Sequence, residues 1–140
     1  MTFRLSEVSR ANLAGVRPDL VSVVEKAIEI TDTDFRVICG VRTLAEQKKM
    51  VASGASRTMN SRHLVQDDGF SHAVDVVALD GGKVSWDWPH YPKIAKAMKA
   101  AGTALGVPVE WGGDWPKFRD GPHFQLPKDY KMKGPANANG

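Results

Sequence analysis

The sequence predicts an α+β domain in which helices pack on a small antiparallel sheet. Apolar residues recur at helical spacing in two segments, short β-rich segments alternate with them, and one tight-turn signal joins two strands into a hairpin. The 140 residues fit a single domain over residues 1–140. We expect its core to span about 18–127 and residues 128–140 to form a flexible tail, because that tail lacks apolar anchors.

The first half of the chain predicts a helix, a strand and a second helix. Pro18 suits the first turn of a helix, and the residues of one buried face follow at helical spacing: Leu20, Val23, Val24, Ala27 and Ile28. The β-rich segment 35–39 predicts a short strand. Thr43 and Glu46 form a capping-box pattern, in which each side chain caps the other's backbone N–H, so a helix should run from there to about Gly54.

A polar segment separates these elements from the strongest predicted strand. Residues 55–71 are rich in Ser, Gly, Asn and Asp and should form a loop. Residues 73–79 are almost entirely apolar and predict a strand. The Asp-Gly-Gly signal at 80–82 then predicts a tight turn, after which residues 83–86 return as the hairpin partner.

The last elements are a helix and two short strands. A helix is expected from about Pro89 to Leu105, because its apolar residues lie on one face and Gly106 can end it. Residues 107–111 and 123–126 predict strands.

Charge and composition limit the classes of function. The formal net charge of +3 and the sequence pI near 9.1 suit an anionic partner, but the basic residues are scattered and no nucleic-acid motif is present, so we expect no nucleic-acid binding. No apolar run approaches the roughly 18–20 residues that span a bilayer. The first residues lack a secretory signal pattern, which favours synthesis in the cytoplasm. The single cysteine, Cys39, excludes an internal disulfide.

Three histidines and one aspartate are candidates for a metal site. His63, His72, His123 and Asp75 are residue types that bind zinc, and a catalytic zinc ion commonly takes three protein ligands and leaves one position for water. Asp75 lies in an apolar strand, where a carboxylate is costly unless it is paired or bound to metal. The alternative is that the histidines are ordinary loop and core residues and that Asp75 is solvated. Spacing alone leaves both interpretations open.

Five motifs in order give the sequence a specific resemblance. They are Gly40–Gln47 (G-x-R-T-x-x-E-Q), Ser61–His63, His72–Asp75, Glu110–Trp115 and Asp120–Phe124. Together they resemble the zinc peptidases of the LAS group, and most closely the phage endolysins that are L-alanyl-D-glutamate endopeptidases, relatives of VanY-type D,D-carboxypeptidases. The resemblance covers roughly residues 20–127. It implies the hedgehog/D-Ala-D-Ala peptidase-like version of the α+β fold.

The resemblance also implies roles for particular residues. His63, Asp75 and His123 match the family's ligands to a single zinc ion. Asp120, three residues before the last ligand, matches the general base. Arg42 matches an arginine near the scissile carbonyl, where it can stabilise developing negative charge.

Four further residues are candidates for substrate binding. Ser61 and Gln47 belong to motifs that carry the resemblance, and Ser61 can hydrogen-bond a substrate. Trp111 and Trp115 lie near the implied site and can line a groove for a stem peptide or glycan, with closure of the core as the alternative.

One departure from the family pattern concerns the first ligand. Relatives commonly read H-x6-D, whereas here Asp75 follows His63 by twelve residues, and the surplus lies in the insertion 65–71. A loop can absorb the extra residues because the cost of loop closure grows slowly with length. His72 is the alternative first ligand, but only His63 has the Ser-Arg context. Two adjacent acids in the insertion, at 67–68, raise the alternative of a second cation such as Ca²⁺.

The resemblance therefore implies a zinc-dependent peptidoglycan endopeptidase that cuts the L-Ala–D-Glu bond of stem peptides and lyses the cell wall. We expect a monomer that is made in the host cytoplasm and reaches the wall after release. The alternatives are a D,D-carboxypeptidase on the same scaffold and a non-catalytic module that binds the wall or a metal ion.

Overall fold

The computed structural model describes residues 2–56, 58–117 and 119–130. The helices are α1 (Glu7–Asn12), α2 (Pro18–Ile30), α3 (Leu44–Ala52) and α4 (His90–Leu105), with a 3-10 turn, η1 (Gly112–Asp114). The strands are β1 (Asp34–Cys39), β2 (Ala73–Asp80), β3 (Lys83–Ser85), β4 (Glu110–Trp111) and β5 (His123–Gln125). The predicted α+β class is confirmed.

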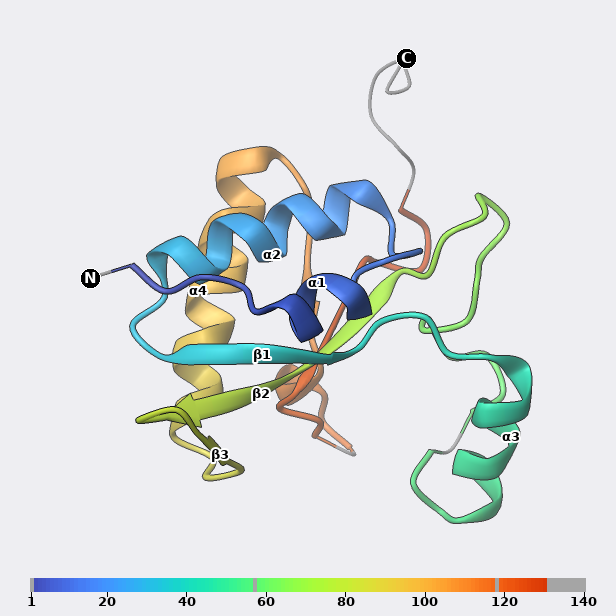
Figure 1. Cartoon of the computed structure of the whole chain (residues 1–140). Coiled ribbons are helices and arrows are strands. Elements are labelled where there is room, and N and C mark those ends of the chain that lie inside the picture. The colour runs from blue at the N-terminus through green and yellow to red at the C-terminus, as the bar shows by residue number, and fades with distance from the viewer. Residues whose placement is uncertain (1, 57, 118, 131–140) are drawn as a thin grey trace.

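The strands form one antiparallel sheet centred on β2. Its order is β1-β2-β5-β4, and β3 pairs with β2 through the predicted hairpin turn. In Figure 1 the long strands β1 and β2 run side by side, and the hairpin lies at one end of the molecule. The last two strands of the chain thus extend the sheet from β2 and bring residues near 110 and 123 beside those near 75.

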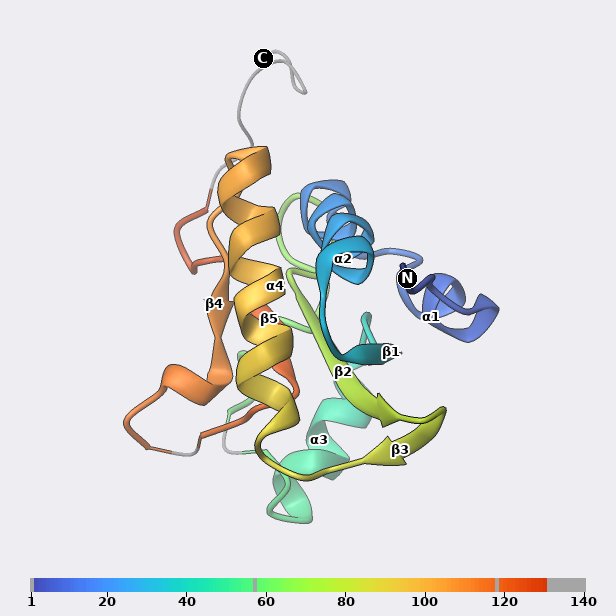
Figure 2. The ribbon, with the colours of Figure 1, turned by 90° about the vertical axis from the view of Figure 1, so that its left-hand side faces the viewer.

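The two long helices cover one face of the sheet. α2 and α4 pack against each other, and α1 contacts β1 (Figure 2). Their apolar faces meet the inward side chains of the strands in a single core, whose fully buried members include Leu20, Val24, Phe35, Val37, Ile94, Met98 and Phe124. α3 lies away from this core, at the far end of the loop that follows β1 (Figure 1).

Strand alternation places the polar candidates on the opposite face of the sheet. Val74 and Val76 of β2 belong to the core, so Asp75 between them points the other way. Phe124 of β5 is fully buried in the same core, and its neighbour His123 therefore also faces away from α2 and α4. The period of two thus separates the core from a polar face formed by neighbouring strands.

Local signals in the sequence explain how two of the helices begin and end. The side chains of Thr43 and Glu46 cap each other's backbone N–H groups at the start of α3, as predicted. Gly106 ends α4 in the left-handed conformation at φ 70°, which a glycine adopts without steric cost. Helix α1, which was not predicted from the sequence, is capped by the Ser6 hydroxyl.

The core also includes residues before position 18, since Leu5, Leu13 and Val16 are buried in it. At the other end, Tyr130 packs partly against the core, whereas residues 131–140 of the expected tail lie outside the described residues. Within the described ranges, no helix combines the length and the apolar character needed to cross a membrane.

Candidate active site

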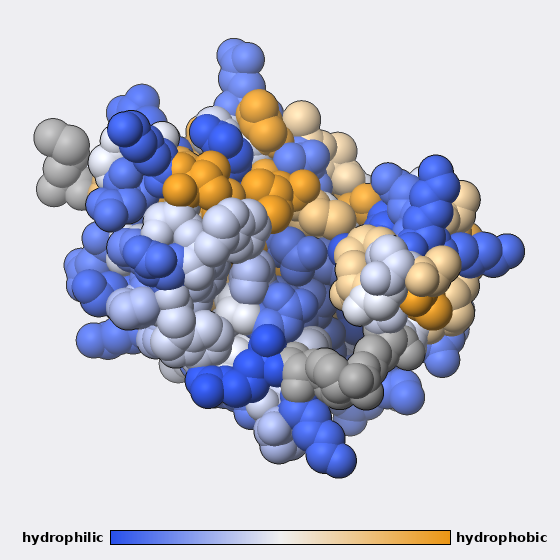
Figure 3. All heavy atoms as spheres, turned by 90° about the horizontal axis from the view of Figure 1, so that it is seen from below, coloured by the Kyte–Doolittle hydropathy of each residue, from blue (hydrophilic) through white to orange (hydrophobic). Residues whose placement is uncertain are grey.

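A cavity of about 890 Å³ opens on the polar face of the sheet. Figure 3 shows it as a hollow between the lobe that carries α3 and the rest of the molecule. Most of the candidate residues line it: Arg42, Ser61, His63, Asp75, Trp115, Asp120 and His123. Gln47 and Trp111 are not among the lining residues.

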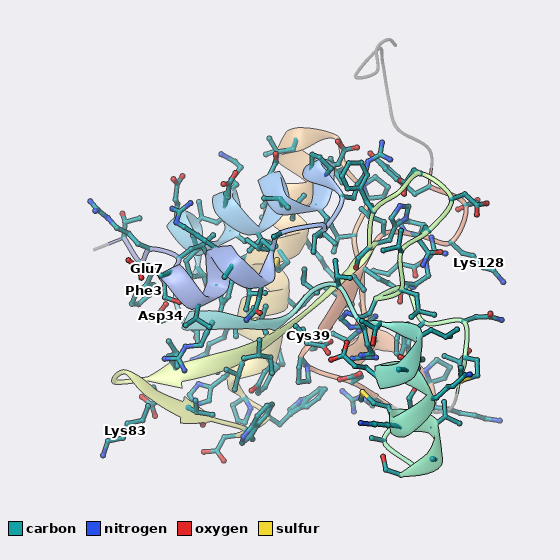
Figure 4. All side chains as sticks on the ribbon, turned by 45° about the vertical axis from the view of Figure 1, so that its right-hand side comes forward. Phe3, Glu7, Asp34, Cys39, Lys83 and Lys128 are labelled. Carbon is teal, nitrogen blue, oxygen red and sulfur yellow. The ribbon has the colours of Figure 1, made fainter. Side chains whose placement is uncertain are left out.

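Strand register brings three groups together at one end of this cavity. Asp75 of β2 lies directly opposite His123 of β5. On the other side of β2, the register with β1 shifts between Val37 and Cys39, which places Cys39 opposite Asp75. Figure 4 labels Cys39 at the end of β1. Bulges of this kind re-aim side chains and are frequent beside active sites.

His63 enters the cluster from the loop and is almost fully buried. Its Nδ1–H donates to the Gly40 carbonyl at 2.8 Å, while its Nε2 lies 3.2 Å from Asp75 Oδ1. That nitrogen is buried and, among the residues that the structure describes, no group meets it in hydrogen-bond geometry. Gly40 is required here, because a Cβ on it would lie 2.1 Å from the carbonyl oxygen of Asn12.

His123 presents its other ring nitrogen to the same oxygen. Its Nδ1 lies 3.1 Å from Asp75 Oδ1, and its Nε2 lies 2.8 Å from Gln125 Oε1. The two imidazole rings meet edge to face with centroids 5.1 Å apart. Both histidines thus have one nitrogen held by a carbonyl oxygen outside the cluster and the other directed at Asp75.

This arrangement fits a divalent cation. With one ring nitrogen of each histidine donating outward, the lone pairs of His63 Nε2 and His123 Nδ1 converge on a carboxylate oxygen, and acceptors converge stably only around a proton or a cation. Two imidazoles and a carboxylate are a donor set that zinc accepts. Cys39 is a further metal-ligand type in the cluster, but its Sγ lies 3.8 Å from His63 Nδ1, on the side of the ring away from the free lone pair.

The protonation of the metal-free cluster follows from its burial and charges. Burial by itself would lower the pKa of His63, but its interactions with Asp75 and Cys39 outweigh that effect and raise the pKa to about 10. Burial would likewise raise the pKa of Asp75, whereas its contacts with His123 and His63 hold that pKa well below its ordinary value. A proton therefore occupies the cluster in the absence of metal.

Asp120 adds a second carboxyl group beside these donors. Its carboxylate oxygen lies within 4.8 Å of ligand atoms of Asp75 and His123. Burial raises its pKa above the ordinary value, and the nearby charge of Asp75 raises it further, against a smaller lowering effect of His123. A carboxylate with a raised pKa is a better proton acceptor near neutral pH.

Arg42 is held at the edge of the cluster by a buried amide. Its Nη1 donates to Gln47 Oε1 at 2.8 Å, and its Nη2 lies 3.5 Å from Asp75 Oδ2. Gln47 is fully buried, and its Nε2 donates to Ser56 Oγ and to the Thr58 carbonyl at 2.8 and 2.6 Å. Gln47 thus connects α3, the following loop and the guanidinium group.

The other substrate-binding candidates lie in different surroundings. Trp115 lines the cavity with its ring centroid 5.2 Å from that of His123. Ser61 also lines it, and its hydroxyl accepts from the His63 backbone N–H at 3.1 Å. Trp111 is nearly buried, stacks between Trp88 and the core, and donates its indole N–H to the Gly121 carbonyl at 2.8 Å. That contact supports the segment that carries the second carboxyl group.

The alternative ligand His72 belongs to a separate polar cluster. Its Nε2–H donates to Asp68 Oδ2 at 2.6 Å, and its Nδ1 accepts from Arg62 Nη2 at 3.2 Å. Asp68 also forms an ion pair with the buried Arg17. Within the described residues, neither Asp67 nor Asp68 belongs to a group of side chains that could hold a metal ion. The insertion thus docks on the body of the protein through its own ion pairs.

Two residues that contact the site, Cys39 and Gln125, were not predicted from the sequence. The position of Cys39 opposite Asp75 depends on the register shift in β1, and no local sequence pattern predicts that shift. Gln125 lies two residues after His123 and so shares its strand face, a signal that the period of two does provide.

Comparisons with known proteins agree with this geometry. A family profile described as phage L-alanyl-D-glutamate peptidase matches residues 1–126. The L-alanyl-D-glutamate peptidase of Escherichia phage T5 is 32% identical over 119 residues, which cover 82% of this chain and 83% of that protein. The crystal structure of the Serratia marcescens L-Ala D-Glu endopeptidase ChiX matches with a TM-score of 0.82 and 46% identity, covering 89% of this chain and 90% of that one.

A third relative is longer than this chain. The L-alanyl-D-glutamate peptidase of Listeria phage A118 is 42% identical over 94 residues, which cover 67% of this chain but only 30% of that protein. The shared region therefore corresponds to about a third of the Listeria phage protein.

Proposed function

The chain belongs to the phage L-alanyl-D-glutamate peptidase family, and from this we propose that it is a zinc-dependent endopeptidase that hydrolyses the L-Ala–D-Glu bond of peptidoglycan stem peptides. The observation that carries the proposal is the convergence of His63 Nε2 and His123 Nδ1 on Asp75, beside the second carboxyl group of Asp120. A site of this composition, in an open cavity, suits hydrolysis of an amide bond.

His63, Asp75 and His123 would hold one zinc ion. The two free lone pairs and the carboxylate oxygen support this set over one that includes Cys39 or His72. When bound, zinc supplies a Lewis acid that polarises a carbonyl group and lowers the pKa of water.

Asp120 would act as the general base and then as the general acid. Its raised pKa favours accepting a proton from the attacking water and returning that proton to the leaving amine. Its place at the cavity, beside Asp75 and His123, supports this role.

Arg42 would stabilise the negative charge that develops on the scissile carbonyl oxygen. Its side chain lines the cavity and is restrained by Gln47, so little reorganisation is needed during the reaction. Gln47 would act through Arg42, while Ser61 and Trp115 would contact the stem peptide directly. Trp111 would support the segment around Asp120 through its contact with Gly121.

We also propose that the protein works as a monomer with a single metal ion, and that it reaches the peptidoglycan after release from the cytoplasm. The engagement of Asp68 by Arg17 and His72 argues against a second cation in the insertion.

Digestion of purified peptidoglycan tests the activity and the metal together. We expect the protein to release fragments with new D-Glu amino termini, strong chelation followed by dialysis to abolish this release, and added zinc to restore it. Lysis that survives chelation would contradict the role of the metal. Release of D-Ala without new D-Glu termini would instead support a D,D-carboxypeptidase, and zinc binding without any cleavage would support a non-catalytic module.

A further inference from the structure

We infer that Gln125, oriented by Glu110, keeps the proton of the neutral His123 ring on Nε2 and so leaves Nδ1 free to bind the metal ion. The inference rests on the zinc site proposed above. Gln125 and Glu110 act through His123, so both are positioning residues.

Strand register brings the three side chains into a row. His123 and Gln125 are two residues apart in β5 and therefore point to the same face of the sheet. Glu110 of β4 lies directly opposite Gln125. Side chains in such positions are close enough to bond across the strands. The Gln125 side chain thus has His123 beside it along its own strand and Glu110 beside it across the sheet.

Glu110 determines which way the Gln125 amide points. Gln125 Nε2 lies 3.0 Å from Glu110 Oε1, and an ionised carboxylate can only accept hydrogen bonds. The NH₂ group must therefore face Glu110, which turns the amide oxygen toward His123. If the amide were reversed, two oxygen acceptors would face each other and an NH₂ group would face the ring.

The orientation of the amide then selects the ring tautomer. Gln125 Oε1 lies 2.8 Å from His123 Nε2 and can only accept, so Nε2 carries the hydrogen. A neutral imidazole has one N–H, so Nδ1 keeps its lone pair, 3.1 Å from Asp75 Oδ1.

Without this contact, the Asp75 carboxylate would favour the competing tautomer. A proton on His123 Nδ1 would form a charge-assisted hydrogen bond to Asp75 Oδ1, an oxygen that also faces His63 Nε2 at 3.2 Å. That tautomer would present an N–H where the metal needs a lone pair. Hydrogen bonds to the far nitrogen of metal-binding histidines raise affinity by holding the required tautomer.

Zinc affinity and ring tautomer test the inference in the full-length protein. We expect Gln125→Met to weaken zinc binding by about 10–100-fold in competition with a chromogenic chelator, because methionine has a similar size but accepts hydrogen bonds poorly. In the metal-free variant, ¹⁵N NMR of His123 at mildly alkaline pH should show the hydrogen moving from Nε2 to Nδ1. The swapped pair Glu110→Gln with Gln125→Glu keeps a donor facing an acceptor and should restore affinity to within about threefold of the unmodified protein.

Gln66→Met is the matched control. Gln66 lines the same cavity, but its amide bonds Arg62 and backbone carbonyls of its own loop. Zinc affinity should stay unchanged in this variant. The inference is overturned if Gln125→Met remains folded, binds zinc as the unmodified protein does and keeps the hydrogen on Nε2. Failure of the unmodified protein to bind zinc would instead refute the proposed metal site, while the tautomer in the metal-free protein would still decide the role of Gln125.

Discussion

Asp75 is the residue on which the geometry of the site depends most. Its Oδ1 faces a nitrogen of each histidine, and its Oδ2 faces the Arg42 guanidinium. A single side chain therefore connects the proposed metal ligands to the proposed stabiliser of the oxyanion. Removing a carboxylate so placed would leave the Arg42 guanidinium without its counter-charge, and burial would then favour the neutral form of His63.

Substitutions of Asp120 and of His123 should have different effects on zinc binding and turnover. Asp120→Ala should keep zinc binding and the fold but lower kcat by about 10²–10⁴-fold, because only proton transfer is lost. His123→Ala should lose zinc affinity as well. Steady-state kinetics and chelator competition on both variants separate the two effects.

Asp114→Ala is the control for Asp120. Asp114 is an exposed acid of the same segment, paired with Lys99 at 2.5 Å, and its loss should leave kcat unchanged. Near-normal turnover in Asp120→Ala would show that another group is the base.

Arg42→Ala should reduce turnover without removing the metal. We expect kcat to fall by about 10²–10³-fold, the usual effect of deleting an oxyanion donor, with zinc affinity close to that of the unmodified protein. Stopped assays on a short stem peptide, with zinc content measured in parallel, give both numbers. If Arg42→Ala reduced only zinc affinity, and not the turnover of the zinc-loaded protein, Arg42 would instead serve to support Asp75.

Among the separate elements, the 65–71 insertion shows how extra residues are accommodated beside the proposed metal site. Asp68 pairs with the buried Arg17 and with His72, so the insertion is attached to the start of α2 and to the residue before β2. His63 precedes the insertion and Asp75 follows it, yet His63 Nε2 lies 3.2 Å from Asp75 Oδ1. The ion pairs of Asp68 thus restrain the longer loop, so that His63 and Asp75 stay close together.

Acid should weaken this attachment in a defined pH range. Burial opposes ionisation of Asp68, but hydrogen bonds from His72 and the Phe70 backbone outweigh it and lower its pKa below 3.8. Because the pKa of the folded state is the lower one, the ionised side chain stabilises the fold fully above about pH 4, and that contribution is lost as the pH falls through the folded-state pKa.

Asp68→Asn should therefore cost about 1–3 kcal/mol in urea unfolding at pH 7, and its difference from the unmodified protein should shrink toward pH 3. The neighbouring Asp67→Asn, which changes an exposed acid, should have no such effect. Equal behaviour of the two variants would contradict the docking role of Asp68.

The elements also show what the sequence could and could not predict. Helix α2, the capping box of α3, the β2–β3 hairpin and the end of α4 follow from local patterns and are confirmed. The register shift that turns Cys39 toward Asp75 depends on pairing between distant strands, and no local pattern encodes it. Gln47 was assigned to the substrate from its motif, while its burial arises only when Ser56 and Thr58 pack back on α3.

For the whole molecule, the proposed ligands join parts of the chain that are far apart in sequence. His63 comes from the loop, Asp75 from β2 and His123 from the last strand, and all three lie on the face of the sheet that α2 and α4 leave open. The resemblance of the sequence to the LAS-group zinc peptidases singled out these three residues as candidate ligands. Their convergence requires the antiparallel register of β2 and β5, which sequence spacing alone left undecided.

Zinc should consequently stabilise the entire fold. A ligand at 100 times its Kd adds about 2.7 kcal/mol to the free energy of unfolding, which for a domain of this size raises Tm by about 10 °C. Calorimetry of the metal-free protein with increasing zinc should show this rise, and His123→Ala should lose most of it. A Tm that does not respond to zinc would mean that the ion does not bind the folded state preferentially.

The short helix α1 has a consequence for anyone who shortens or tags this protein. It lies outside the cavity, yet the Ser9 hydroxyl and the Asn12 amide bond the backbone of Val37, and the carbonyl of Asn12 abuts Gly40, whose own carbonyl holds His63. Trimming the amino-terminal helix would thus loosen the strand end that aligns His63, the first of the proposed ligands. Although no residue of α1 lines the cavity, a variant that lacks this helix should hold the metal ion less tightly.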